Sequence, residues 1–283
     1  MLKEPLSHTQ EFLLQQKLQN RGLFNLECYT IDKMSKTIAL ISGGNQGIGL
    51  ATATRLAREH GYQVIIGSRN ADNGIKAAKE LQAEGLSVDS VQLDITSDDS
   101  IANAAKYIDE KYGKLDVLIN NAGVLLDIGA RSDVTSGMSL RQLWDLTLST
   151  NVTGTACLTE AMIPLLRKSS QRPRVIFVST RMASLAESLN PNTLYYKIDY
   201  KMYDASKVAV NMLVSNYARI LGEDMKARVN AVCPGLIQTK LTNYNAYGGK
   251  PEDGAQRILE LATVSDDDET TGTFSDSNGA IPW

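Results

Sequence analysis

A glycine-rich turn between a strand-like and a helix-like segment constrains the fold of this chain more than any other feature. Residues 42–49 read Ser-Gly-Gly-Asn-Gln-Gly-Ile-Gly. They follow the apolar run Thr37–Ile41 and precede a helical pattern from Ala51 to Arg58. A strand that enters a helix through such a turn is typical of dinucleotide-binding folds, because the backbone N–H groups at the helix start can face a pyrophosphate.

Three glycines of this turn have distinct physical roles in this interpretation. Gly43 allows the sharp turn, Gly47 leaves space where phosphate oxygens approach, and Gly49 lets the helix pack closely on the sheet. The alternative is a surface loop that uses glycine only for its left-handed geometry, which the flanking strand and helix patterns disfavour. The candidate cofactor-binding residues of the turn are Gly43, Asn45, Gln46, Gly47, Ile48 and Gly49.

The rest of the chain alternates apolar, strand-like runs with helical patterns. This alternation predicts an α/β fold: a doubly wound parallel sheet (Rossmann fold) in a single domain, with helices on both faces. Ligands of such sheets bind at the carboxyl ends of the strands. The expected strands are 37–42, 62–67, 88–93, 115–119, 174–179 and 228–233, and the expected helices are 48–60, 71–84, 98–112, 139–168 and 201–222.

Changes in composition along the chain predict its boundaries. Residues 1–35 are expected to form an N-terminal extension without a targeting signature. Residues 36–283 are expected to form the dinucleotide-binding domain. Within it, the stretch at about 236–260 is rich in Thr, Tyr, Gly and Pro and predicts a mobile substrate lid, and the segment 265–269 predicts a solvated acidic turn.

Composition excludes several classes of function. The 283 residues are 43% hydrophobic and 22% charged, and the net charge of −3 gives no basic field for nucleic acid. The longest apolar runs are strand-sized and too short to cross a bilayer. The 3 cysteines and 2 histidines predict neither a disulfide framework nor a metal site. We therefore expect a cytoplasmic protein without a nucleic-acid, membrane or metal partner.

Five motifs, in order between Lys36 and Trp283, resemble those of the short-chain dehydrogenase/reductase family. They are the glycine turn, an aspartate after the third strand, Asn-Asn-Ala-Gly after the fourth, Tyr-x-x-x-Lys, and Pro-Gly-x-x-x-Thr after the sixth. For Asp94 and Asn121, a plain turn role is the alternative. Beyond the glycine turn, the resemblance implies cofactor contacts at Asp94, Ile95, Asn121, Ala122, Gly123, Tyr203, Lys207, Pro234, Gly235, Ile237 and Thr239.

The Tyr-x-x-x-Lys motif occurs three times, so its context decides which copy matters. Tyr29, Tyr107 and Tyr203 each have a lysine four residues later. For Tyr107, a shared solvent-exposed helix face is the better interpretation. Only Tyr203 follows a buried strand that ends in hydroxyl residues, and the small residues after it leave room for a cofactor beside the helix.

The chemistry of a phenol and an ammonium group suggests roles for Tyr203 and Lys207. A free tyrosine has a pKa near 10, and a nearby cation favours the phenolate, so we expect Lys207 to activate Tyr203 as an acid or base. The family resemblance implies that Tyr203 donates a proton to a carbonyl oxygen as hydride arrives from the nicotinamide. It also implies that Lys207 binds the nicotinamide ribose.

Two further catalytic positions are implied by the resemblance. The family's substrate-binding serine corresponds to Thr180, because neighbouring side chains at a strand end point to opposite faces and the register favours Thr180 over Ser179. Asn151 matches an asparagine that helps hold a water relay to the lysine. The alternative for Asn151 is a polar residue that only kinks a helix.

The end of the second strand bears on the choice of cofactor. Arg69 lies where an acidic residue would bind the 2′-hydroxyl of NAD, and arginine instead accommodates the 2′-phosphate of NADP. We therefore expect NADP(H), with NAD(H) as the alternative. Gln46 weakens this prediction slightly, since many NADP-preferring relatives carry a basic residue in the glycine turn. An exposed loop charge is the other interpretation of Arg69.

A long insertion, Arg181–Met202, separates Thr180 from Tyr203 and resembles that of carbonyl-reductase-like members. The leading hypothesis is thus an NADPH-dependent reductase of a small ketone or aldehyde, reversible as an alcohol dehydrogenase. A non-catalytic dinucleotide-binding sensor is the alternative. A sugar-nucleotide epimerase or dehydratase is disfavoured because the chain has no extra substrate domain. The resemblance also implies a homodimer or homotetramer, with a monomer left open.

Overall fold

The structure is a computed structural model that describes residues 36–127 and 137–283. Thr37–Trp283 form one compact unit. The expected N-terminal extension, 1–35, and the motif copy at Tyr29 lie outside the described residues. None of the helices in the described part of the chain is both long and apolar enough to cross a bilayer.

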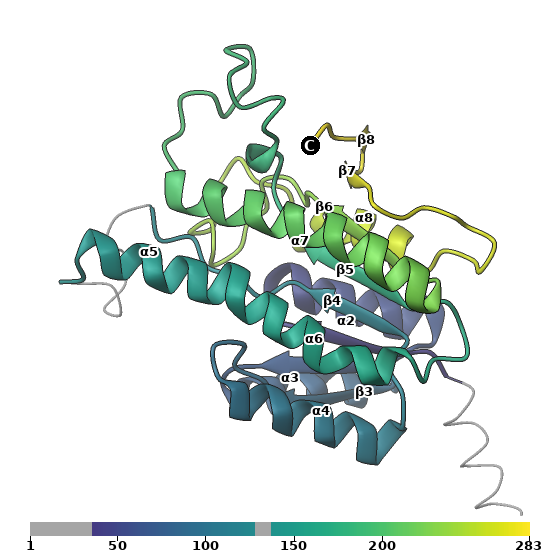
Figure 1. Ribbon diagram of the computed structural model, residues 1–283. Coiled ribbons are helices and arrows are strands. Elements are labelled where there is room, and N and C mark those ends of the chain that lie inside the picture. Colours follow the sequence, from purple (N-terminus) through teal and green to yellow (C-terminus); the bar gives the residue numbers. More distant parts are fainter. Residues whose placement is uncertain (1–35, 128–136) are drawn as a thin grey trace, which may run out of the picture. The chain divides into compact units, whose positions relative to one another are not determined.

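An eight-stranded sheet forms the centre of the molecule, with strand order β3-β2-β1-β4-β5-β6-β7-β8 (Figure 1). All neighbouring strands run parallel except the last pair, β7 and β8. The order reverses between β1 and β4, which is the point where ligands bind in doubly wound sheets. The strands are β1 (Ile38–Ser42), β2 (Gln63–Ser68), β3 (Val88–Gln92), β4 (Val117–Asn120), β5 (Arg174–Val178), β6 (Arg228–Val232), β7 (Phe274–Asp276) and β8 (Gly279–Ala280).

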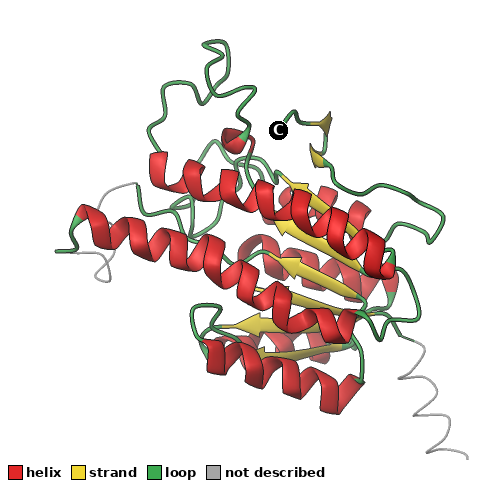
Figure 2. Ribbon diagram, viewed as in Figure 1, coloured by secondary structure: helices red, strands yellow, loops and turns green. Residues whose placement is uncertain are grey.

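Helices cover both faces of the sheet, as the alternating sequence pattern predicts (Figure 2). In β1, Ile38 and Leu40 enter one hydrophobic core, while Ala39 and Ile41 enter the other, because successive strand residues face opposite sides. One core is covered by α4 (Asp98–Tyr112), α6 (Thr155–Leu166) and α7 (Lys201–Met225), and the other by α2 (Gly47–His60), α3 (Ala71–Ala83) and α8 (Pro251–Ala262).

The expected helix at 139–168 is present but interrupted. It consists of α5 (Leu140–Leu148), a π-helical turn η1 (Ser149–Gly154) and α6. The turn brings Gly154 against the backbone of Ile95, where a Cβ atom would overlap the Ile95 carbonyl oxygen. Such π-turns insert one extra residue into a helix and are frequent at functional sites.

The expected mobile lid at about 236–260 is only partly an irregular segment. Its second part forms α8, whose residues Ala255, Ile258 and Leu259 are buried against the sheet. The sequence carries the signal for this helix, since Pro251 stands at the first helical position and Glu252 and Asp253 occupy the first turn. The sequence analysis missed this helix, and the irregular portion of the stretch ends at Lys250.

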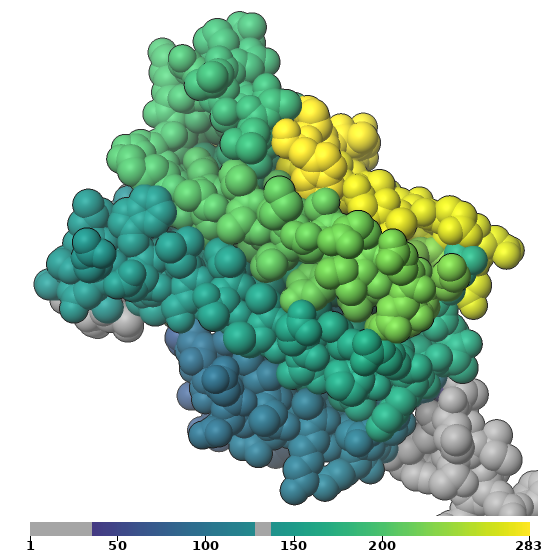
Figure 3. Space-filling view, in the orientation of Figure 1, coloured from purple at the N-terminus to yellow at the C-terminus, as the bar shows by residue number. Residues whose placement is uncertain are grey.

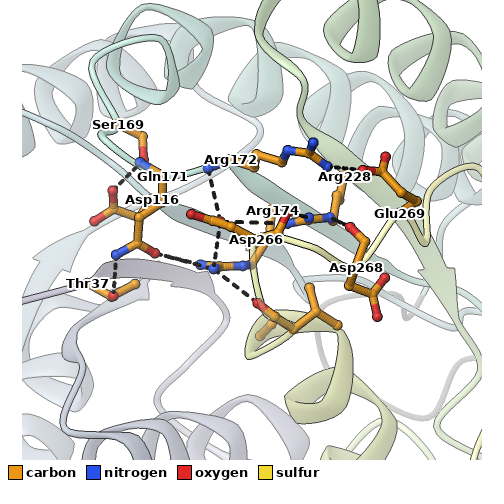
Figure 4. Close-up of polar contacts among 12 residues, drawn as sticks. Thr37, Asp116, Ser169, Gln171, Arg172, Arg174, Arg228, Asp266, Asp268 and Glu269 are labelled. Carbon is orange, nitrogen blue, oxygen red and sulfur yellow. Dashed lines mark hydrogen bonds and ion pairs between the residues drawn. The ribbon is translucent and has the colours of Figure 1, made fainter.

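The amino end of the sheet, opposite the expected site, holds a polar network (Figure 4). Arg174 and Arg228 begin β5 and β6 and are 4% and 3% exposed. Arg228 donates hydrogen bonds to the carbonyl oxygens of Asp266 and Asp268, and Arg174 donates one to that of Val264. The acidic turn is exposed as expected, but it is also anchored to the sheet by buried guanidinium groups.

The predicted insertion after Thr180 stands above α7, next to the last residues of the chain (Figure 3). Arg181 joins the two segments with ion pairs to Glu187 at 2.8 Å and to Asp276 at 2.7 Å. The backbone N–H of Ala186 also donates to the Trp283 carbonyl oxygen at 3.1 Å. The residue that follows Thr180 is therefore anchored to the final strands of the sheet.

Candidate functional site

The glycine turn has the backbone geometry that a phosphate-binding loop needs. Gly43 and Gly47 adopt positive φ angles of 65° and 54°, which residues with a Cβ atom rarely adopt. A Cβ atom on Gly49 would overlap the Gly43 carbonyl oxygen, so the start of α2 requires glycine there. The N-cap residue of α2, Gln46, makes no side-chain capping bond. The first N–H groups of the helix are thus available to an anion, and the turn fits a dinucleotide pyrophosphate.

The loop after β4 is hydrogen-bonded to the glycine turn at the switch point of the sheet. Asn121 Nδ2 donates to the carbonyl oxygens of Ser42 at 2.9 Å and Gly43 at 3.2 Å. The Ser42 hydroxyl accepts from the backbone N–H groups of Asn121 and Ala122, both at 3.0 Å. Two of the motifs expected to bind one cofactor therefore lie side by side.

Three residues expected to contact the cofactor, Arg69, Asp94 and Ile95, lie at the ends of β2 and β3. Arg69 follows β2, is exposed, and its guanidinium has no ion-pair or hydrogen-bond partner among residues 36–127 and 137–283. One carboxylate oxygen of Asp94 accepts from the backbone N–H and the hydroxyl of Thr96, at 2.9 and 2.7 Å. Asp94 therefore has the turn role that the sequence left open, with its other oxygen available. Ile95 is buried beside it.

The segment after β6 closes the other side of the glycine turn. Ile237 is 4% exposed and pairs with Gly249 in an isolated bridge. A Cβ atom on Gly47 would lie 3.1 Å from Thr239 Cγ2. Pro234 begins this segment, and Gly235 adopts a φ of 80°. The segment thus lies close to the phosphate-binding turn, although it is distant in sequence.

Tyr203 and Lys207 occupy successive turns of α7. The Lys207 ammonium group lies 5.7 Å from the centre of the Tyr203 ring and donates a hydrogen bond to the Val178 carbonyl oxygen at 2.8 Å. Tyr203 is partly exposed, and its hydroxyl makes no hydrogen bond within the described part of the chain. Its proton is therefore available to another group.

Burial opposes the pKa change that the sequence predicts for Tyr203. Desolvation raises the pKa of the Tyr203 phenol above its ordinary value, with smaller contributions from Cys233 and Asp204. Desolvation also lowers the pKa of Lys207 from 10.5 to about 8. In the protein without ligand, removal from water disfavours the charged forms of both groups, so the net change in the Tyr203 pKa is upward, and the activation of Tyr203 by Lys207 stays a prediction. A protonated phenol is nevertheless the form that can donate a proton.

The two hydroxyl residues after β5 have different surroundings. Ser179 is 1% exposed, and its hydroxyl donates to Asn211 Oδ1 at 2.7 Å. Thr180 is partly exposed, and its hydroxyl accepts from the backbone N–H of Met182 at 3.3 Å. Among the described residues, the Thr180 hydroxyl donates to no group, so it keeps a donor for a substrate oxygen.

Asn151 lies in the π-helical turn η1, fully buried. Its side chain accepts from the Val124 N–H at 2.8 Å and donates to the Val124 carbonyl oxygen and the Ser206 hydroxyl, both at 2.9 Å. A Cβ atom on Gly123 would lie 3.2 Å from Asn151 Oδ1 and 3.5 Å from Lys207 Nζ. These bonds tie the Asn151 side chain to the loop after β4 and to α7, and the water relay to Lys207 that the resemblance implies stays a prediction.

Three groups of the site were not identified from the sequence. They are the Val178 carbonyl oxygen, the Ser206 hydroxyl and the carboxylate of Asp127, which accepts hydrogen bonds from the backbone of Met202 and Tyr203. Spacing gives no signal for Asp127, because it lies 75 positions before Met202 in the sequence. Ser206 lies within the Tyr-x-x-x-Lys motif, where the sequence indicated only that a small residue leaves room for a cofactor.

The fold and the site together define a doubly wound α/β protein with a glycine turn at the switch point and a tyrosine and a lysine near the carboxyl end of β5. A family model described as "short chain dehydrogenase" matches residues 37–247. The chain belongs to the short-chain dehydrogenase/reductase family, whose members are oxidoreductases that act on small molecules, and it is similar to the carbonyl reductases of that family.

Individual relatives support the same assignment. A short-chain dehydrogenase/reductase of Aspergillus fumigatus is 34% identical over 237 residues, covering 80% of this chain and 88% of the relative. Human "Carbonyl reductase [NADPH] 1" is 31% identical, covering 87% of this chain and 98% of the relative. A short-chain dehydrogenase of Shigella flexneri, solved in complex with NADP, has a TM-score of 0.71 at 26% identity, covering 86% of this chain and 97% of that one.

Proposed function

We propose that this protein is an NADPH-dependent reductase that converts a small ketone or aldehyde to an alcohol, with Tyr203 as the proton donor. One observation carries the proposal. Tyr203 and Thr180 each retain a hydroxyl proton that no group in the described part of the chain accepts. Two such donors beside a dinucleotide-binding edge suit a carbonyl oxygen that becomes an alkoxide.

In this mechanism, the chain's own residues bind the carbonyl and supply a proton. The Thr180 hydroxyl would hold the carbonyl oxygen, and Tyr203 would donate its proton to that oxygen. Burial keeps the Tyr203 pKa high, so the phenol stays protonated at neutral pH. A bound nicotinamide would supply the hydride, which is the cofactor's own chemistry.

Lys207 would act on the cofactor and on the electrostatics of the site. Its ammonium group is fixed by the Val178 carbonyl oxygen, and the absence of a side chain on Gly123 keeps the space next to it open. From this position Lys207 would bind the nicotinamide ribose and favour negative charge on the Tyr203 oxygen once the proton has left. Asn151 would hold the neighbouring loop in place.

NADP(H) is the preferred cofactor in this proposal. The guanidinium of Arg69, which has no partner in the described part of the chain, is suited to a 2′-phosphate, which arginine binds through paired hydrogen bonds. The NADPH named for the human carbonyl reductase and the NADP of the Shigella complex support this choice.

The test is consumption of NADPH with a panel of ketones and aldehydes. We expect turnover by the wild type, loss of activity in Tyr203→Phe, and normal activity in the matched control Tyr200→Phe, a tyrosine just before the same helix. Cofactor binding without turnover of any carbonyl would instead favour the non-catalytic sensor. Equal activity of Tyr203→Phe and the wild type would exclude Tyr203 as proton donor.

A further inference from the structure

Helix α7, which carries Tyr203, begins without a cap from its own sequence. The N-cap residue Tyr200 makes no side-chain capping bond. The first N–H groups of a helix have no partner within the helix and need one from elsewhere. Here the partner is Asp127, from the loop after β4.

The two carboxylate oxygens of Asp127 accept one hydrogen bond each from consecutive residues of the first turn. One accepts from the Met202 N–H at 2.8 Å, and the other accepts from the Tyr203 N–H at 3.0 Å. Bonds between an ionised carboxylate and backbone N–H groups are stronger than neutral ones, and the positive end of the helix dipole strengthens them further. One of the two bonds is made by the backbone of Tyr203 itself.

The same loop also holds the carbonyl side of Tyr203. Asn151 bonds both backbone groups of Val124 and donates to the Ser206 hydroxyl, which in turn donates to the Tyr203 carbonyl oxygen at 2.6 Å. The backbone of Tyr203 is therefore linked at its N–H and at its carbonyl to the loop 121–127. Asn121, at the start of that loop, bonds the glycine turn.

We propose that Asp127 is a positioning residue that fixes Tyr203 relative to the cofactor-binding loop by capping α7. This inference rests on the proposed function, because it assumes that Tyr203 is the proton donor. Without the cap, the first turn of α7 would fray and Tyr203 would lose its alignment. A misplacement of about 1 Å at a reacting group can lower the rate by roughly 100-fold.

Asp199 provides a matched control for the charge of Asp127. Both carboxylates raise the pKa of Asp204, after the larger effect of desolvation. Asp199 is exposed and pairs with Lys201 at 2.7 Å. Replacing Asp199 therefore removes a carboxylate from the same helix start but leaves the bonds to Met202 and Tyr203 intact.

The experiment compares Asp127→Ala, Asp127→Asn and Asp199→Ala with the wild type for kcat, KM and NADPH dissociation constant. We expect Asp127→Ala to lower kcat by roughly 10- to 100-fold with the NADPH dissociation constant unchanged. Asp127→Asn keeps one acceptor oxygen and should therefore show a smaller loss of kcat. This variant also tests the proposal if the alanine variant folds poorly. Asp199→Ala should resemble the wild type.

Three outcomes would overturn the proposal. They are wild-type kcat in Asp127→Ala, an equal loss in Asp199→Ala, and a loss of NADPH binding in parallel with kcat. Hydrogen–deuterium exchange separates this inference from the proposed function, since it needs no turnover. The Met202 and Tyr203 amides should exchange faster in Asp127→Ala, and unchanged exchange would refute the cap even if the wild type reduced no carbonyl.

Discussion

The Ser179 hydroxyl donates a hydrogen bond to Asn211 Oδ1 over 2.7 Å, which commits the first of two neighbouring hydroxyl groups to helix α7. The second, that of Thr180, keeps its proton free within the described part of the chain. The two residues are adjacent in sequence, and either could have been the substrate donor. Their environments assign them different roles.

Substitution of Thr180 should therefore affect catalysis, whereas substitution of Ser179 should affect stability. Thr180→Ala should lower kcat by roughly 100-fold, since it removes a donor to the developing oxyanion, and Thr180→Ser should keep most of the activity. Ser179→Ala should keep kcat but lower the free energy of unfolding by about 1–3 kcal/mol, because it leaves the buried Asn211 oxygen unpaired. Steady-state kinetics and urea unfolding measure the two effects. A larger loss of kcat in Ser179→Ala than in Thr180→Ala would reverse the assignment.

The buried ammonium group of Lys207 should make the stability of the protein rise with pH. Its pKa is lowered from 10.5 to about 8 in the folded state, so between these values the unfolded chain binds more protons and stability increases with pH. Between pH 7.5 and 9.5 the gain from this group is roughly 2 kcal/mol.

Lys207→Met is the control for this prediction, because other groups also titrate in the range. Urea unfolding at both pH values should show a pH-dependent gain that is larger in the wild type than in Lys207→Met. The same variant should lose reductase activity. Identical pH dependence in the two proteins would mean that Lys207 keeps its ordinary pKa when folded.

Arg69 should determine the preference for NADPH over NADH. Removing a charged hydrogen-bond partner of a phosphate costs about 1.5–3 kcal/mol, so Arg69→Ala should raise KM for NADPH by roughly tenfold or more and leave KM for NADH unchanged. Arg58→Ala is a matched control, since Arg58 is a surface arginine paired with Glu84. Equal effects of Arg69→Ala on both cofactors would place the 2′-phosphate elsewhere.

Local sequence signals predicted the fold class and the order of the sheet's first six strands. Each of the 6 expected strands is present, with ends shifted by a residue or two, because buried parallel strands have continuous apolar runs. Context also separated two copies of the Tyr-x-x-x-Lys motif, since Lys207 lies at the end of β5, where it bonds the Val178 carbonyl oxygen. Tyr107 instead accepts a hydrogen bond from Lys111 at 2.8 Å, and Lys111 also pairs with Asp89, as expected for a surface face of α4.

Features that depend on distant contacts or on burial were not predictable in this way. The cap of α7 comes from Asp127, which is remote in sequence and carries no motif. The pKa of Tyr203 is raised chiefly by desolvation, and the extent of burial cannot be judged from spacing. The last two strands, β7 and β8, have only 3 and 2 residues, too few to show a periodic pattern.

Hydride transfer to a carbonyl carbon, coupled to protonation by Tyr203, can be followed directly with NADPH deuterated at its transferable C4 position. In a single turnover with a ketone that the enzyme accepts, mass spectrometry of the product should show one deuterium on the alcohol carbon. Tyr203→Phe should bind the cofactor but transfer little or no deuterium. An unlabelled alcohol, or equally fast labelling in Tyr203→Phe, would contradict the account.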